Sequence, residues 1–199
     1  MAPDHCPYVS RGGLKLQAAL DAFEINPAGQ LWADFGCNVG GFTDCLLQRG
    51  AAKVFAVDTG YGQLAWTLRK DDRVVVMERT NALHAEAPEL VDGVAIDAGW
   101  TCQDRIIPAA AAWLGPDGPG HVISLLKPHY EWTKLAGQKA RAPLDDRQIR
   151  QVLDAVAGQL AGLGWAIGRK IPCPITGKGG NTEWLIWAVR DGMDVDGTC

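Results

Sequence analysis

The sequence predicts one α/β domain with a seven-stranded, mostly parallel sheet and helices on both of its faces. Three observations lead to this expectation. Apolar runs of strand length alternate with stretches of helical apolar spacing, which is typical of βαβ units. The 199 residues suffice for one domain with a substantial core, and no internal repeat or low-complexity stretch divides them. We therefore expect a single domain over residues 1–199, with an N-terminal segment and opening helix in residues 1–25 and the core in residues 30–190.

The expected elements of the first half follow from local patterns. The helical spacing of apolar residues predicts an opening helix over residues 13–23. An apolar run over residues 30–35 predicts the first strand, and a glycine-rich turn then leads into a helix that extends to about residue 49. Gly50 is suited to stop this helix because glycine tolerates the left-handed conformation. The next strands are expected over residues 53–58, 73–78 and 91–97.

The second half continues the alternation of strands and helices. A helical stretch over residues 103–114 ends in a turn over residues 115–120 that is rich in glycine and proline. A buried strand over residues 121–126 is ended by Pro128, and residues 144–163 have the pattern of a long amphipathic helix. The last two strands are expected over residues 165–171 and 183–190, joined by a segment rich in proline and glycine over residues 172–181.

Polar residues and glycines follow the predicted strands at their carboxyl ends. In a doubly wound sheet, ligands bind in the crevice beyond these ends. We therefore expect the residues that stand there to line one site. They are Gly36, Asp58, Glu78, Asp97 and Lys127.

The composition is that of an ordinary globular protein without targeting or membrane signals. No apolar run approaches the ~20 residues that span a bilayer, and residues 1–10 lack the features of a signal peptide, so we expect a cytoplasmic protein without a membrane partner. The six cysteines include no C-x-x-C pair, so we expect free thiols and no metal site. The formal net charge of −4 disfavours an extensive nucleic-acid surface but allows a local basic face.

The segment D-F-G-C-N-V-G-G-F over residues 34–42 follows the first predicted strand and opens a helix. Gly36 permits a tight turn, and Gly40 and Gly41 let the backbone approach a ligand closely. The spacing differs from G-x-G-x-x-G, which disfavours a dinucleotide. The D-x-G-x-x-x-G spacing instead suits the methionyl end of S-adenosylmethionine, whose ammonium group Asp34 can attract. A glycine-rich turn that binds no ligand is the alternative.

Further cofactor contacts are expected after the next two strands. Asp58 can accept hydrogen bonds from ribose hydroxyls, and Glu78 and Asn81 follow the third strand, where adenine commonly lies. A helix cap or a solvated turn is the alternative role for these side chains. The complete set of candidate cofactor-binding residues is Asp34, Gly36, Asn38, Gly40, Gly41, Phe42, Asp58, Glu78, Asn81 and Asp97.

Five segments carry a resemblance to a known family, and together they extend over most of the chain. The sequence resembles the methyltransferase domain of the TlyA family, which are hemolysin-like ribosomal RNA 2′-O-methyltransferases related to the FtsJ/RrmJ group. The resemblance implies the Rossmann-like class I fold of S-adenosylmethionine-dependent methyltransferases, with S-adenosylmethionine as the methyl donor. The segments are Y-V-S-R-G-G-L-K-L (8–16), G-G-F-T-D-C-L-L-Q-R-G-A (40–51), V-D-T-G-Y-G-Q-L (57–64), the stretch from R-V to E-R-T-N (73–81) and L-L-K-P-H-Y-E (125–131).

The same resemblance implies a catalytic group of two lysines and two carboxylates. Matched motif by motif, the group is Lys15, Asp97, Lys127 and Glu183. We hypothesise that Lys127 deprotonates or orients the acceptor hydroxyl and that Asp97, nearest the cofactor, positions this lysine. Lys15 and Glu183 would hold the substrate and tune Lys127. The four charges sum to zero, which makes their joint partial burial tolerable. Four unrelated surface charges are the alternative.

The chain departs from the family pattern in three places. Family members usually carry an N-terminal S4-type RNA-binding domain, for which this chain has no room, so a separate RNA-binding partner can replace it. The cofactor turn reads C-N-V over residues 37–39, where the family usually has a small residue followed by Ser-Thr. After Asp97 the chain reads A-G-W instead of Val-Ser-Phe, and Trp100 is the best candidate to shape the acceptor pocket.

Candidate acceptor-binding residues flank the site on two sides. Basic loops with aromatic residues can hold phosphates and stack on an unpaired base, although a solvated loop is the alternative. The candidates on one side are Arg11, Arg69, Lys70, Arg73 and Arg79. Those in the expected loop after Lys127 are His129, Trp132, Lys134, Lys139 and Arg141.

The leading interpretation is an S-adenosylmethionine-dependent 2′-O-methyltransferase that acts on RNA, with ribosomal RNA as the expected target. The complete Lys-Asp-Lys-Glu group favours RNA. The acidic net charge, the A-G-W segment and the absent S4 domain favour an O-methyltransferase for a small hydroxyl acceptor. A protein that binds the cofactor without turnover is a third interpretation, which the altered cofactor turn allows and the complete catalytic group disfavours.

Overall fold

The computed structural model of the chain describes residues 6–99, 101–116, 120–140, 142–177 and 180–191. Strands and helices alternate along most of this length, as the sequence pattern predicts. In chain order the elements are α1 (Gly12–Phe23), β1 (Leu31–Phe35), α2 (Gly41–Gln48), β2 (Lys53–Val57), α3 (Trp66–Arg69), β3 (Val74–Met77), β4 (Gly93–Ile96), α4 (Gln103–Ala111), β5 (His121–Leu126), α5 (Pro128–Ala136), α6 (Asp146–Ala161), β6 (Trp165–Pro172) and β7 (Trp184–Arg190).

One sheet organises the described part of the chain. Its seven strands lie in the order β3-β2-β1-β4-β5-β7-β6. The pairs among β1 to β5 are parallel, whereas β7 is antiparallel to both β5 and β6. The predicted sheet, seven-stranded and mostly parallel, is therefore confirmed. The strand order reverses between β1 and β4, and in such sheets ligands bind outside the carboxyl ends of the strands at this reversal.

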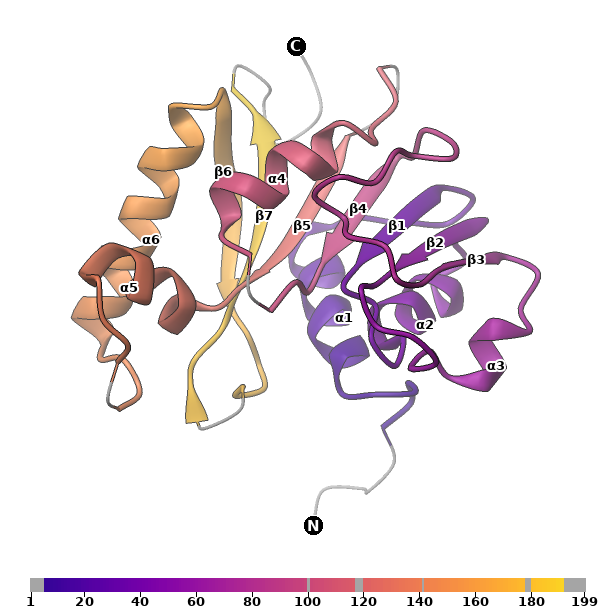
Figure 1. The fold of residues 1–199 in the computed structure, drawn as a ribbon, viewed down its shortest axis with the longest axis horizontal. Helices are drawn as coiled ribbons and strands as arrows, with labels where there is room; N and C mark the ends of the chain where they lie inside the picture. The colour runs from indigo at the N-terminus through magenta and orange to yellow at the C-terminus, as the bar shows by residue number, and fades with distance from the viewer. Residues whose placement is uncertain (1–5, 100, 117–119, 141, 178–179, 192–199) are drawn as a thin grey trace.

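Helices cover both faces of the sheet (Figure 1). On one face, α1 and α2 pack against each other and bury apolar side chains such as Leu16 and Leu46. On the other face, α4 and α6 cover a second core that includes Ile107 and Val152. Because successive side chains of a strand alternate between faces, Trp32 belongs to the first core and the next residue to the second. Each face thus has its own apolar core, and the site forms at the edge between them.

Two helices are present where the sequence pattern predicts none. α3 is a single turn, too short for an apolar period to reveal it. α5 begins at Pro128, which we expected only to end the preceding strand. Proline also suits the first turn of a helix, because its missing N–H would have no partner there. Lys134, expected in a loop, therefore lies on α5, and Lys139 follows the helix.

The long amphipathic helix expected over residues 144–163 is α6, and its first residue is fixed by a capping box. The carboxylate of Asp145 accepts a hydrogen bond from the backbone N–H of Gln148 at 2.8 Å. The side-chain oxygen of Gln148 accepts one from the backbone N–H of Asp145 at 3.0 Å. Reciprocal bonds of this kind satisfy two donors of the first helical turn, so the helix begins at this point.

No described helix has both the length and the apolar character needed to cross a bilayer. Within the described ranges, no three His, Cys, Asp or Glu side chains come together as metal ligands.

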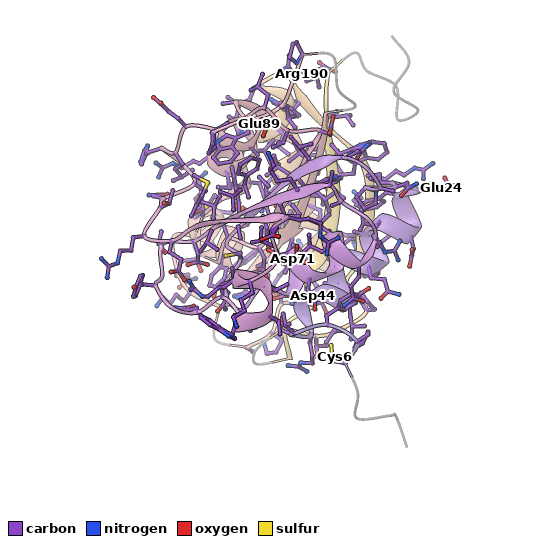
Figure 2. The ribbon with its side chains drawn as sticks, turned by 90° about the vertical axis from the view of Figure 1, so that its right-hand side faces the viewer. Cys6, Glu24, Asp44, Asp71, Glu89 and Arg190 are labelled. Atoms are coloured by element: carbon purple, nitrogen blue, oxygen red, sulfur yellow. The ribbon has the colours of Figure 1, made fainter. Side chains whose placement is uncertain are left out.

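Charged residues such as Glu24 and Arg190 lie at the periphery (Figure 2). Cys199 lies outside the described residues, and the described cysteines are free thiols at positions 6, 37, 45, 102 and 173.

Gly93 and Gly158 allow a matched test of packing in this fold. A Cβ on Gly93, the first residue of β4, would lie 2.6 Å from the indole of Trp32, whereas one on Gly158 in α6 would meet no atom within 4 Å. We expect Gly93→Ala to lower the free energy of unfolding by about 1–3 kcal/mol through overpacking. Gly158→Ala should raise it by about 1 kcal/mol because alanine favours the helix. Urea denaturation measures both changes, and a Gly93→Ala variant as stable as wild type would contradict this packing.

Candidate functional site

A cavity of about 870 Å³ opens at the carboxyl edge of the sheet. It lies beyond the ends of β1, β2, β4 and β5, where the sequence predicts a ligand site. Its lining includes all four predicted catalytic residues, which are Lys15, Asp97, Lys127 and Glu183. Its lining also includes most predicted cofactor residues, which are Asp34, Gly36, Asn38, Gly41, Phe42, Asp58, Asn81 and Asp97.

The four predicted catalytic residues form two ion pairs. Lys15 Nζ lies 2.5 Å from Glu183 Oε2, and Lys127 Nζ lies 2.6 Å from Asp97 Oδ1. The side chains are mostly shielded from solvent, with exposed fractions from 5% for Glu183 to 28% for Asp97. Each charge therefore has an opposite charge in contact, and this pairing is the condition for burying charged groups at tolerable cost.

The topology of the sheet explains how residues so distant in sequence meet. Asp97 directly follows β4 and Lys127 directly follows β5, and the carboxyl ends of parallel strands lie at the same edge. Glu183 precedes β7 instead. Because β7 runs antiparallel to β5, with Trp184 opposite Leu126, the beginning of β7 lies at that same edge. Lys15 reaches the edge from α1, which packs against β7.

Gly36 is a site residue whose lack of a side chain the structure explains. It has a φ of 86°, in the left-handed region that disfavours other residues. A Cβ at this position would lie 2.7 Å from the carbonyl oxygen of Asp97. Glycine therefore lets the turn after β1 approach the end of β4, which holds the cofactor turn directly beside Asp97.

Gly40 and Gly41 both allow close packing within the protein, and Gly41 also lines the cavity. A Cβ on Gly40, which has a φ of 101°, would lie 2.3 Å from the Leu68 side chain. A Cβ on Gly41 would lie 2.3 Å from Ser10 Oγ and 2.9 Å from the backbone nitrogen of Gly13. We predicted that these glycines allow close approach of a ligand. The structure shows close approach of other parts of the chain, and only Gly41 is among the residues that line the cavity.

Asp34 is completely buried, and only one of its two carboxylate oxygens accepts hydrogen bonds from described residues. Oδ2 accepts hydrogen bonds from the backbone N–H of Thr43 at 2.9 Å and from its hydroxyl at 2.7 Å. Oδ1 has no hydrogen-bond partner among the described residues. Burial raises the pKa of Asp34 to about 7, although the hydrogen bonds from Thr43 oppose the shift. An unpartnered buried oxygen at a cavity wall fits a cationic ligand group such as an ammonium.

Asp58 and Asn81 are also at the cavity, and both have local partners. Asp58 Oδ2 accepts a hydrogen bond from the backbone N–H of Asn38 at 2.8 Å, and its Oδ1 accepts one from that of Gly60 at 2.7 Å. Asn81 Oδ1 accepts one from the backbone N–H of Leu83 at 3.1 Å. Asp58 thus fixes the cofactor turn at Asn38, and both side chains keep free lone pairs or donors for a ligand.

Glu78, like Gly40, is a predicted cofactor residue that is not part of the cavity lining. Its carboxylate forms an ion pair with Arg69 and accepts a hydrogen bond from the backbone N–H of Gly62 at 2.8 Å. It is not among the residues that line the cavity. Both contacts are made to Oε1 of Glu78, and a role of this carboxylate toward adenine stays a prediction.

The candidate acceptor-binding residues differ in their contacts, because some line the cavity and others form ion pairs with carboxylates. Arg11 and His129 line the cavity, and burial lowers the pKa of His129. Trp132 is half-buried and packs against the core under α4 and α6. Trp100 and Arg141 lie outside the described residues. The candidates engaged in ion pairs are Arg69 with Glu78, Arg73 with Asp71 at 2.7 Å, and Lys134 with Asp104 at 2.6 Å.

Lys70 and Arg79 each lie over an exposed aromatic ring. Lys70 Nζ is 4.9 Å from the ring centre of Trp66, and the Arg79 guanidinium carbon is 4.2 Å from that of Tyr61. Trp66 is 68% exposed and Tyr61 69% exposed. The sequence analysis singled out the two cations but neither ring, because only the structure shows that both rings face solvent.

The segment between β6 and β7 supplies site residues that the sequence analysis missed. Ile175, Thr176 and Gly177 line the cavity. A Cβ on Gly177 would lie 2.4 Å from Glu183 Oε1, so glycine allows this segment to pack onto Glu183. The only signal in the sequence is the abundance of glycine and proline in this stretch, which predicts a loop but not its position over Glu183.

Comparison with known proteins agrees with this geometry. The model of a family of FtsJ-like methyltransferases matches residues 8–190. The 16S/23S rRNA (cytidine-2′-O)-methyltransferase TlyA of Mycobacterium tuberculosis is 42% identical to this chain over 187 residues. The match covers 90% of this chain and 68% of that protein.

Solved structures share the arrangement of the sheet and helices. A protein from Lactococcus lactis described as "a putative hemolysin" has a TM-score of 0.85 and 35% identity, over 96% of this chain and 92% of its own. An S-adenosylmethionine-dependent methyltransferase from Mesorhizobium loti has a TM-score of 0.63 at 17% identity, over 87% of this chain and 96% of its own. The second likeness shows the fold alone, which is that of class I S-adenosylmethionine-dependent methyltransferases, as expected.

The raised pKa of Asp34 predicts a pH-dependent effect of Asp34→Asn on stability. Between the ordinary value of 3.8 and about 7, the unfolded chain loses a proton that the folded chain keeps, so wild-type stability falls as pH rises through this window. Asparagine cannot ionise. The difference in Tm between Asp34→Asn and wild type should therefore shift in favour of the variant from pH 5 to pH 8. Calorimetry checks this, and a difference that is constant with pH would contradict it.

Proposed function

Because the chain belongs to the family of FtsJ-like methyltransferases, we propose that it transfers a methyl group from S-adenosylmethionine to a ribose 2′-hydroxyl of RNA, with ribosomal RNA as the substrate. The observation that carries this proposal is the pair of ion pairs, Lys15 with Glu183 and Lys127 with Asp97, on the wall of one cavity. The relative named as a ribosomal RNA 2′-O-methyltransferase, 42% identical to this chain, supports the choice of acceptor.

The residues of the cofactor turn fit the donor. Asp34 Oδ1, buried and without a partner among the described residues, is suited to accept a hydrogen bond from the methionyl ammonium group. Asp58 and Asn81, at the ends of the next strands, are suited to the ribose and the adenine. Bound S-adenosylmethionine supplies a methyl group on a positively charged sulfur, which needs no further activation by the protein.

The acceptor hydroxyl is assigned to the two ion pairs. As the ammonium of its ion pair, Lys127 Nζ would donate a hydrogen bond to the hydroxyl oxygen and orient it, and after losing one proton to water it would take the proton of the hydroxyl, while Asp97 holds the nitrogen in place. Lys15 and Glu183, which line the same cavity, would hold the ribose. Transfer to oxygen then depends mainly on alignment, and fixed positions of reacting groups contribute much of the acceleration in such reactions.

An exposed aromatic surface beside the cavity favours RNA over a small acceptor. Thr59 and Gln63 line the cavity, and the same segment carries Tyr61 and leads into Trp66. The backbone N–H of Ala65 donates to the carbonyl of Val39 at 3.0 Å, which ties the start of α3 to the cavity rim. Exposed aromatic rings next to cations can stack on unpaired bases. A small-molecule acceptor would leave this surface without a role, although the net charge of −4 favours that alternative.

We expect Lys127→Met and Asp97→Asn to reduce methyl transfer to ribosomal subunits from cells lacking this gene. The loss should be about 10²–10⁴-fold in kcat, the usual contribution of a general base or orienting group. Tm should fall because each variant leaves one partly buried charge without its partner, so turnover is compared at a temperature at which each variant is folded. Lys53→Met is the control, because Lys53 pairs with Glu89 at the opposite end of β2. Tritium transfer from labelled S-adenosylmethionine, followed by identification of the 2′-O-methylnucleoside, measures the effect. Near-wild-type turnover in either variant would show that the ion pair is not catalytic.

Trp66→Ala and Lys70→Ala should raise KM for RNA and leave the Kd of S-adenosylmethionine unchanged. Loss of one stacked base is worth about 1–3 kcal/mol, which corresponds to a rise of roughly 5- to 150-fold. Leu163→Ala, at an exposed apolar residue beyond the end of α6, is the control and should have no effect. Steady-state kinetics with ribosomal RNA provides the test. Unchanged KM in Trp66→Ala would argue for the small-molecule alternative.

A further inference from the structure

Glu131 is a buried carboxylate near the site that neither ion pair uses. It lies on α5 and is 6% exposed. Its Oε1 accepts a hydrogen bond from the backbone N–H of Gln103 at 2.8 Å. Gln103 is the first residue of α4, so the bond joins two helices that follow different strands.

This bond supplies a cap that α4 lacks. Cys102 stands at the N-cap position and makes no side-chain hydrogen bond to the helix. The first N–H groups of a helix have no partner within it, and a carboxylate is favoured at this positive end of the helix dipole. Glu131 therefore caps α4 from α5, and the N-terminus of α4 is fixed by a residue outside its own segment.

The same bond closes a ring of contacts around the catalytic pair. Lys127 is the N-cap of α5 and stands one helical turn before Glu131. Its carbonyl oxygen accepts a hydrogen bond from the backbone N–H of Tyr130 at 3.0 Å. On the other side, a short segment leads from Asp97 to Gln103. The ring therefore runs from Lys127 through α5 to Glu131, across the bond to Gln103, back to Asp97 and across the ion pair to Lys127.

A second contact joins α5 to α4, the ion pair between Lys134 and Asp104 at 2.6 Å, but the Lys134 side chain is 42% exposed, so this pair contributes little to the position of α5. The buried residues of this helix are Pro128 and Glu131, with Trp132 half-buried. Burial raises the pKa of Glu131, so the carboxylate is kept here against a desolvation cost. A short, mostly polar helix with one buried carboxylate depends on that carboxylate for its orientation.

We propose that Glu131 is a positioning residue for methyl transfer, which fixes the separation of Lys127 and Asp97 through its hydrogen bond to the N–H of Gln103. The expected effect on the rate of methyl transfer rests on the proposed function. The structural part of the inference, the separation of Lys127 and Asp97, does not depend on the identity of the acceptor.

The kinetic test compares Glu131→Ala, Glu131→Gln and a remote cap variant. Displacement of a catalytic group by about 1 Å can cost 10²-fold in rate, so Glu131→Ala should lose roughly 10- to 100-fold in kcat at saturating substrates. Glu131→Gln should restore most of the rate, because its amide oxygen still accepts from Gln103. Asp145→Ala removes the cap of α6, and should lower Tm while kcat stays at the wild-type value. Wild-type kcat in Glu131→Ala, or equal loss in Glu131→Gln and Glu131→Ala, would overturn the proposal.

A second variant removes the donor instead of the acceptor. Gln103→Pro deletes the N–H, and proline suits the first position of a helix when the preceding residue is extended, as Cys102 is with φ −70° and ψ 154°. If both residues act through one bond, adding Glu131→Ala to Gln103→Pro should cost less than twofold more in kcat. Independent, multiplied losses in the double variant would contradict the shared bond.

Crystal structures of the Glu131 variants separate this inference from the proposed function. In Glu131→Ala we expect Lys127 Nζ and Asp97 Oδ1 to be more than 4 Å apart, against 2.6 Å in the wild-type chain, and in Glu131→Gln to keep the short distance. This result can be obtained even if ribosomal RNA is not the acceptor. An unchanged ion pair in Glu131→Ala would overturn the positioning role whatever the substrate.

Discussion

The pairing of two lysines with two carboxylates at one edge of the sheet is the constraint on which the site depends. A single buried lysine or glutamate would be costly, and each of these charges has its partner within 2.6 Å. The pairs also join elements that are distant in sequence, because Lys15 lies on α1 and Glu183 just before β7. The same contacts that make the charges tolerable therefore bring α1, β4, β5 and β7 together around the cavity.

The antiparallel β7 strand and the glycines complete the arrangement. A wholly parallel sheet would place the start of its last strand at the opposite edge, far from Lys127, whereas β7 brings Glu183 to the carboxyl edge. Gly36 then lets backbone approach the carbonyl oxygen of Asp97, and Gly177 lets backbone approach the carboxylate of Glu183, more closely than any side chain would permit. Charge pairing and close backbone approach together define the shape of the cavity.

The sequence predicted the fold class, and the four residues proposed as a catalytic group form two ion pairs on the wall of one cavity, whereas contacts that depend on tertiary structure could not be predicted. Alternating apolar patterns identified the seven strands, because buried strands leave a periodic signal. The proposed catalytic group came from matching motifs, since no local pattern relates residues so far apart. Its members are Lys15, Asp97, Lys127 and Glu183. The ion pair of Glu78 with Arg69 could not be predicted, because it depends on the position of α3, a helix too short to leave a pattern. The exposure of the Tyr61 and Trp66 rings likewise required the structure.

The most direct test of the account is a crystal structure of this chain with S-adenosylhomocysteine, the product of the donor after transfer. We predict that its amino group contacts the Oδ1 atom of Asp34, the oxygen without a partner among the described residues, and that its sulfur faces Lys127 and Asp97 across the cavity. A complex with the sulfur turned away from both ion pairs, or with the ligand outside the cavity, would contradict the claim that these charges receive the acceptor hydroxyl.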